Sequence, residues 1–240
     1  MDDSEHLAEK YLLALDCGAV VFEPDGNIPP DFSVDARIGV EVRRLNQNYE
    51  KSDGSIEGLE ELAIPLWQRL KKLLLGLGPS ADGESWFVAM DFHRPLGPWK
   101  SLKVKIEQEL RAFMDSPIRS PKTLKITKNF KLGISHASKD HGTFFLLGGS
   151  SDYDSGGWVM SEVAKNLRLC IDEKERKIAR YRAKYSEWWL LLADYIDFSM
   201  EPDDRRLFRT EVMPSIRHSF SRIVLIDPRD HRRAFETFKL

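Results

Sequence analysis

The stretch that most constrains the fold is Ile28–Asn46, with the sequence IPPDFSVDARIGVEVRRLN. Apolar side chains occupy every second position of its two arms, namely Phe32, Val34, Ile38, Val40 and Val42. A two-residue apolar period is typical of strands that have one buried face. We therefore predict a tight β-hairpin, and this hairpin restricts where the polar residues between the apolar ones can lie.

The register of the hairpin follows from keeping both apolar sets on the same side of the sheet. Only a turn centred on Ala36 does so, and it pairs Phe32 with Val40. The same register puts Asp31 directly opposite Glu41. Opposed β-carbons lie roughly 4.5–5.5 Å apart, so two carboxylates there repel each other unless something neutralises them. A divalent cation would do that.

Two further residues share the predicted face of the carboxylates. Arg43 projects from it one step beyond Glu41, and we expect Gly39 to leave open space beside the acidic pair.

The spacing Pro30-Asp31, nine residues, then Glu41-Val42-Arg43 resembles the motif of the PD-(D/E)xK nuclease superfamily. The chain also resembles a family of uncharacterised bacterial proteins with that core. The resemblance implies a restriction-endonuclease-like fold in which Asp31 and Glu41 hold Mg²⁺, or Mn²⁺, with help from the main-chain carbonyl of Val42. The superfamily's usual lysine is replaced by Arg43. Arginine stays protonated, so we expect Arg43 to act on the charge of the substrate.

Two residues outside the motif are further candidates. A first helix from about Asp3 to Leu15 carries Glu9, and in the resembling nucleases a glutamate of this helix sometimes approaches the metal; the alternative is a solvated acidic face. Lys174 falls on the apolar stripe of a long helix, Val159–Lys184. Its aliphatic part either packs on the apolar surface while the ammonium reaches solvent, or an acidic partner holds the ammonium inward. In the second case Lys174 would substitute for the missing lysine.

The order of elements predicts an α/β (α+β) fold. We expect a helix, a three-strand antiparallel meander, and then a helix–strand crossover formed by Ile56–Leu77 and Trp86–Phe92. An added antiparallel sheet and the long helix follow. We assign residues 1–240 to a single domain, with a nuclease-like core in residues 1–115 and a C-terminal elaboration in residues 116–240 packed on it.

Composition is that of an ordinary globular chain, with 42% hydrophobic and 31% charged residues among 240. Cys17 and Cys170 are far apart and outside any CxxC spacing, which favours two core thiols in a reducing cytosol over a disulfide or a zinc site. The acidic N-terminus lacks the order of a signal peptide, and no apolar run approaches the ~20 residues of a spanning helix. We expect a cytoplasmic protein with no membrane partner.

The formal net charge of −2 provides no global field for nucleic acid, so any such contact depends on local patches. The Arg-rich region from Arg205 onward is one such patch, for which a solvated surface is the alternative.

These observations leave three hypotheses about function. The first is a Mg²⁺-dependent endonuclease or phosphodiesterase acting on nucleic acid, with DNA ahead of RNA as the partner. The second is a nuclease-like fold that has lost catalysis and serves as a binding or regulatory module. In the third, Glu41 pairs with a neighbouring arginine on a solvent face and nothing binds.

Overall fold

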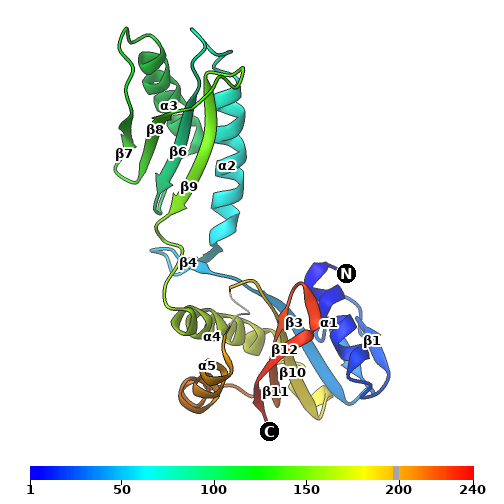
Figure 1. Ribbon diagram of the computed structural model, residues 1–240. Helices are drawn as coiled ribbons and strands as arrows, with labels where there is room; N and C mark the ends of the chain where they lie inside the picture. The colour runs from blue at the N-terminus through cyan, green and yellow to red at the C-terminus, as the bar shows by residue number, and fades with distance from the viewer. Residues whose placement is uncertain (197–199) are drawn as a thin grey trace. The chain divides into compact units, whose positions relative to one another are not determined.

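The computed structural model describes residues 1–196 and 200–240 of this chain, and it has an α+β architecture (Figure 1). The described residues divide into two compact units. The first comprises residues 1–47 and 156–240, and the second comprises residues 48–155. None of the helices in the described ranges combines the length and the apolar character that crossing a bilayer requires.

The first unit is built on a six-stranded sheet with the order β1-β2-β3-β10-β11-β12. The three central strands run parallel to one another, and the outer pairs are antiparallel. The strands are β1 (Val20–Phe22), β2 (Phe32–Val34), β3 (Ile38–Leu45), β10 (Glu187–Asp194), β11 (Arg222–Asp227) and β12 (Asp230–Lys239).

The predicted hairpin register is confirmed, because β2 and β3 pair Phe32 with Val40 and Val34 with Ile38. Asp35 and Ala36 form the tip of the turn, each with a φ of 50°. Two consecutive residues with positive φ are the feature that type I′ hairpin turns require. The Asp35 carboxylate stabilises this turn by accepting a hydrogen bond of 2.7 Å from the main-chain N–H of Ala19.

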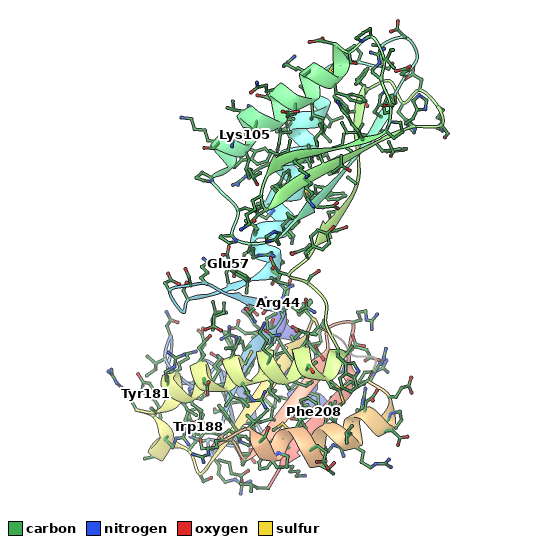
Figure 2. The ribbon with its side chains drawn as sticks, turned by 90° about the vertical axis from the view of Figure 1, so that its left-hand side faces the viewer. Arg44, Glu57, Lys105, Tyr181, Trp188 and Phe208 are labelled. Atoms are coloured by element: carbon green, nitrogen blue, oxygen red, sulfur yellow. The ribbon has the colours of Figure 1, made fainter. Side chains whose placement is uncertain are left out.

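Helices cover both faces of this sheet. Helix α1 (Asp3–Ala14) begins at a capping box made by Asp2 and Glu5 and packs on the face that holds the apolar hairpin residues. Helix α4 (Val159–Ile178) packs on the opposite face with an apolar stripe against β10 and β11. Figure 2 shows α4 in yellow-green, with Tyr181 labelled just beyond its C-terminal end. The shorter elements of this unit are η1 (Arg182–Lys184), α5 (Pro202–Leu207), η2 (Phe208–Val212) and η3 (Met213–Ser215).

The second unit has its own core, in which two helices pack on one face of a four-stranded sheet with the order β7-β8-β6-β9. A small two-stranded ribbon, β4 (Asn48–Glu50) and β5 (Ile56–Gly58), precedes it. Its other elements are α2 (Leu59–Leu75), β6 (Trp86–Phe92), α3 (Trp99–Met114), β7 (Lys122–Thr127), β8 (Phe130–His136) and β9 (Phe145–Asp152). The added sheet was expected to be antiparallel, but β9 pairs with β6 in parallel.

A buried arginine organises one end of this second sheet. The Arg94 side chain is 3% exposed and lies 2.8 Å from the Asp152 carboxylate and 3.1 Å from that of Asp154. Its other terminal nitrogen donates to the main-chain carbonyl of Leu59 at 2.7 Å. The ion pairs therefore connect the segment just after β6 with the end of β9 and the loop that follows it.

The expected crossover is wrong. Helix α2 and strand β6 belong to the second unit, whereas the strand that pairs with β3 is β10, which the chain reaches through α4. Burial explains the difference, because β10 is buried on both faces and β6 alternates between buried and half-buried positions. A strand buried on both faces belongs in the centre of a parallel arrangement covered by helices. The sheet of the hairpin is thus completed by residues 156–240, not within residues 1–115.

Candidate functional site

Asp31 and Glu41 lie side by side on the α4 face of the first sheet. Asp31 immediately precedes β2. The hairpin pairs Phe32 with Val40, so the next residues on the two arms, Asp31 and Glu41, lie next to each other. The main-chain N–H of Val42 donates a hydrogen bond of 2.7 Å to Asp31 Oδ2, which fixes that carboxylate against β3. The Asp31 side chain is 17% exposed and that of Glu41 is 0% exposed. The two carboxylates therefore form a pair that opens to solvent only on the Asp31 side.

Lys174 of α4 contacts both carboxylates of this pair. Its Nζ lies 2.6 Å from Glu41 Oε2 and 3.1 Å from Asp31 Oδ2. The side chain is 6% exposed. Of the two positions expected for this lysine, the structure therefore shows the inward one, held by both carboxylates.

Lys177, three residues further along α4, is a second cation at the site that the sequence did not single out. Its Nζ lies 3.2 Å from Asp31 Oδ1 and 3.3 Å from Glu41 Oε2. Its side chain is 42% exposed. The i,i+3 spacing from Lys174 was the available signal, since residues at this spacing share a helix face. The charge-rich composition of this segment is also typical of a solvated surface, which makes that signal weak.

The two carboxyl groups differ in proton affinity because their hydrogen-bond and charge partners differ. Burial raises the pKa of Glu41, and the charge of Lys174 only partly offsets this effect. Burial also acts to raise the pKa of Asp31, but the Lys174 charge, the Val42 N–H and the Lys177 charge together outweigh it and hold that pKa below its usual range. Pairs of acids whose pKa values are driven apart in this way are common at catalytic sites.

One buried oxygen of the pair has no hydrogen-bond donor. Glu41 Oε1 is enclosed, and no described residue donates a hydrogen bond to it. A buried carboxylate oxygen without a partner is costly, and such an atom in a folded protein needs an explanation. A bound cation is one explanation that suits an oxygen ligand.

The oxygen atoms of this site are suitable ligands for a hard divalent cation. The two carboxylates of Asp31 and Glu41 and the main-chain carbonyl of Val42 are all oxygen ligands, and Mg²⁺ is usually held by one or two carboxylates together with waters. Among residues 1–196 and 200–240, no group of three or more His, Cys, Asp and Glu side chains is arranged to hold a metal. A cation here would therefore keep several sites for water or substrate.

Arg43 is ion-paired with Glu173 of α4, and its side chain is 22% exposed. It projects toward α4 as the register predicted, but it meets an acidic partner there. The expectation that Arg43 faces the substrate's charge therefore does not match its surroundings, because Glu173 already neutralises it. The ion pair connects β3 to the same helix that supplies Lys174.

Two other expectations about the site are corrected. Glu9 lies on α1, which covers the face of the sheet opposite Glu41, so the structure does not bring it to the acidic pair. Gly39 does not leave open space: a β-carbon at this position would lie 3.0 Å from the Trp188 ring of β10. Trp188 is paired in register with Gly39, and this long-range pairing fills the space.

Most of the arginines of the predicted basic tail are bound to carboxylates. Arg229 and Arg233 contact the buried Asp227, and Arg222 contacts Glu236. These ion pairs remove much of the positive field that the tail's composition suggested. Comparison of the whole chain with family models, with curated proteins and with solved structures finds no match.

Proposed function

We propose that this protein is a metal-dependent phosphodiesterase that hydrolyses nucleic acid, with DNA ahead of RNA as its substrate. The observation that carries the proposal is the buried Glu41 carboxylate, whose Oε1 has no donor among the described residues. It lies beside Asp31 and within 2.6 Å of Lys174 Nζ. An acidic pair with an adjacent lysine is the set of groups that the PD-(D/E)xK resemblance implies.

The order of elements supports a restriction-endonuclease-like core. A helix, a three-strand meander, a helix and a parallel strand follow one another as α1, β1–β3, α4 and β10 when residues 48–155 are set aside as an insertion. In this proposal Lys174 of α4 takes the role of the lysine that Arg43 replaces.

Asp31, Glu41 and the Val42 carbonyl would hold Mg²⁺ or Mn²⁺. The bound ion supplies a water of lowered pKa and polarises the scissile phosphate. Ligand carboxylates must be ionised, so the raised pKa of Glu41 makes cation binding weaken as the pH falls.

The two lysines supply positive charge beside the acidic pair. Lys174 and Lys177 present ammonium groups that can stabilise the charge developing on a phosphate, a role that preorganised donors perform well in a partly buried site. A lysine can also take or give a proton at Nζ, whereas the guanidinium of Arg43 cannot. Arg43 instead positions α4 on β3 through Glu173.

A specific observation also favours the catalytically inactive binding module. The two ammonium groups already neutralise the two carboxylates, so the cluster is balanced in charge without a cation. In that case the protein would bind nucleic acid and leave it intact.

The test is cleavage of a mixed set of single- and double-stranded DNA and RNA with Mg²⁺ or Mn²⁺. We expect Asp31→Asn and Glu41→Gln to abolish turnover. Lys174→Met should lower turnover far more than Arg43→Ala, because Lys174 contacts the acidic pair and Arg43 acts through α4. Glu9→Gln is the matched control, since it removes one carboxylate from the other face of the sheet and should cut as wild type does.

Two results would contradict the proposal. If wild type binds nucleic acid but cuts none of these substrates, the inactive module is the correct account. If cleavage survives Glu41→Gln, the acidic pair is not the catalytic centre.

A further inference from the structure

A cavity of about 460 Å³ lies in the first unit, away from the residues that form the acidic pair. It is lined by Arg209, Met213, Pro214, Ile216, Arg217, His218 and Phe238, which come from η2, η3, the segment after η3 and β12. Phe208, labelled in Figure 2, begins η2. Pockets for small ligands usually measure roughly 300–1,000 Å³, so the cavity is large enough for one.

The wall of this cavity is apolar and well ordered by packing. Met213 is 3% exposed and Ile216 is 6% exposed. The ring of Phe238 meets that of His218 edge to face, with centroids 4.4 Å apart. The half-buried Phe238 ring provides a surface against which a flat ring can lie, and Met213 and Ile216 belong to the buried core on which it packs.

The opening of the cavity is positively charged. Neither Arg209 nor Arg217 forms an ion pair with any other residue in the described ranges, in contrast to the arginines of β11, β12 and the turn that joins them. Among the residues that the structure describes, no acidic side chain lines the cavity. The nearby Glu175 is occupied by the main-chain N–H and hydroxyl of Ser219, at 2.6 and 2.7 Å, and by Arg182.

His218 adds a polar group with a defined hydrogen bond. Its Nδ1 lies 3.1 Å from the main-chain carbonyl of Phe220, which can only accept, so Nδ1 carries the proton. Burial lowers the pKa of this imidazole, which leaves Nε2 as an acceptor at neutral pH.

We propose that this cavity binds a nucleoside monophosphate. Arg209 and Arg217 bind the phosphate, because guanidinium groups match the geometry and charge of phosphate oxygens. The base lies against the half-buried Phe238, since the face of a nucleobase stacks well on an aromatic side chain. The inference concerns a second site and does not depend on whether the acidic pair is catalytic.

The experiment is calorimetric titration of the full chain with AMP, with adenosine and with inorganic phosphate. We expect AMP to bind at least tenfold more tightly than either fragment, because only AMP engages both halves of the cavity. Binding of inorganic phosphate as tight as that of AMP would overturn the proposal, as would no binding of AMP at millimolar concentration.

Point variants test whether AMP binds in this cavity. Arg217→Ala and Arg209→Ala each remove one phosphate contact and should weaken AMP binding about tenfold or more; both residues are exposed, so the fold should persist. Arg206→Ala removes one exposed positive charge from α5 without touching the cavity and is the matched control. Equal weakening by Arg206→Ala would mean that overall charge causes the binding, and the cavity assignment would be wrong. Asp31→Asn should bind AMP as wild type does, which separates this test from the nuclease test.

Discussion

Replacing Lys174 with methionine should destabilise the first unit strongly at pH 7. The Lys174 side chain is 6% exposed and its main partner, Glu41, is 0% exposed. Methionine keeps most of the volume of the side chain but removes the ammonium, so the Glu41 carboxylate would remain buried without its closest cation. Breaking a buried ion pair by removing one partner costs about 3–5 kcal/mol of unfolding free energy.

Burial, more than distance, should determine this magnitude. Lys177 contacts the same two carboxylates at 3.2 and 3.3 Å, but its side chain is 42% exposed. Exposed ion pairs contribute about 0.2–1 kcal/mol, because water and salt screen them. Lys177→Met is therefore the matched control, and it should cost no more than about 1 kcal/mol.

The assay is urea unfolding at pH 7, followed by circular dichroism, with hydrogen exchange of the β3 amides to assign the loss to the first unit. The double variant Lys174→Met/Glu41→Gln should recover most of the loss, since it removes the unpaired charge as well. If Lys174→Met costs no more than Lys177→Met, or if the double variant is as unstable as the single one, the buried ion pair does not stabilise the fold.

Three further predictions follow from other contacts. Gly39→Ala should lower unfolding free energy by about 1–3 kcal/mol, because the new methyl group would press on the Trp188 ring; thermal unfolding measures this, and an unchanged midpoint would contradict it. The pKa of Asp31 is held below its ordinary 3.8, so its contribution to stability is present above that pH and is lost as the pH falls through the lower folded value. The unfolding free energies of wild type and Asp31→Asn can be measured in urea between pH 2 and 6, a range that spans about two units on either side of the ordinary Asp pKa. The two free energies should converge only at the acidic end of this range. Arg94→Met should cost the second unit about 3–5 kcal/mol by leaving two carboxylates without their buried partner, and should not change cation binding by the first unit.

The hairpin and its acidic pair could be predicted from the sequence because they depend on local order. Alternating apolar residues restrict the register, and a register within one hairpin needs no knowledge of distant parts of the chain. The inward position of Lys174 was one of two alternatives for the same reason, since its place on an apolar stripe is a local feature of α4.

The remaining features depend on contacts between distant parts of the chain. The strand beside β3 lies beyond residues 48–155, and nothing local indicates that β10 and not β6 completes the sheet, except that residues 188–193 of β10 are all apolar. The pairing of Gly39 with Trp188 and that of Arg43 with Glu173 follow from this one long-range arrangement. Lys177 was missed because nothing in the sequence around an exposed lysine of a charge-rich helix indicates which distant carboxylates it contacts.

Titration of the chain with Mn²⁺ measures whether the acidic pair binds a divalent cation at all. We predict that wild type binds one Mn²⁺, with affinity that weakens as the pH falls, and that Asp31→Asn and Glu41→Gln each lose this binding. Glu9→Gln should bind as wild type does, because α1 covers the other face of the sheet. If wild type takes up no Mn²⁺, or if Glu41→Gln binds it as tightly as wild type, the pair formed by Asp31 and Glu41 is a structural ion-pair cluster and not a metal site.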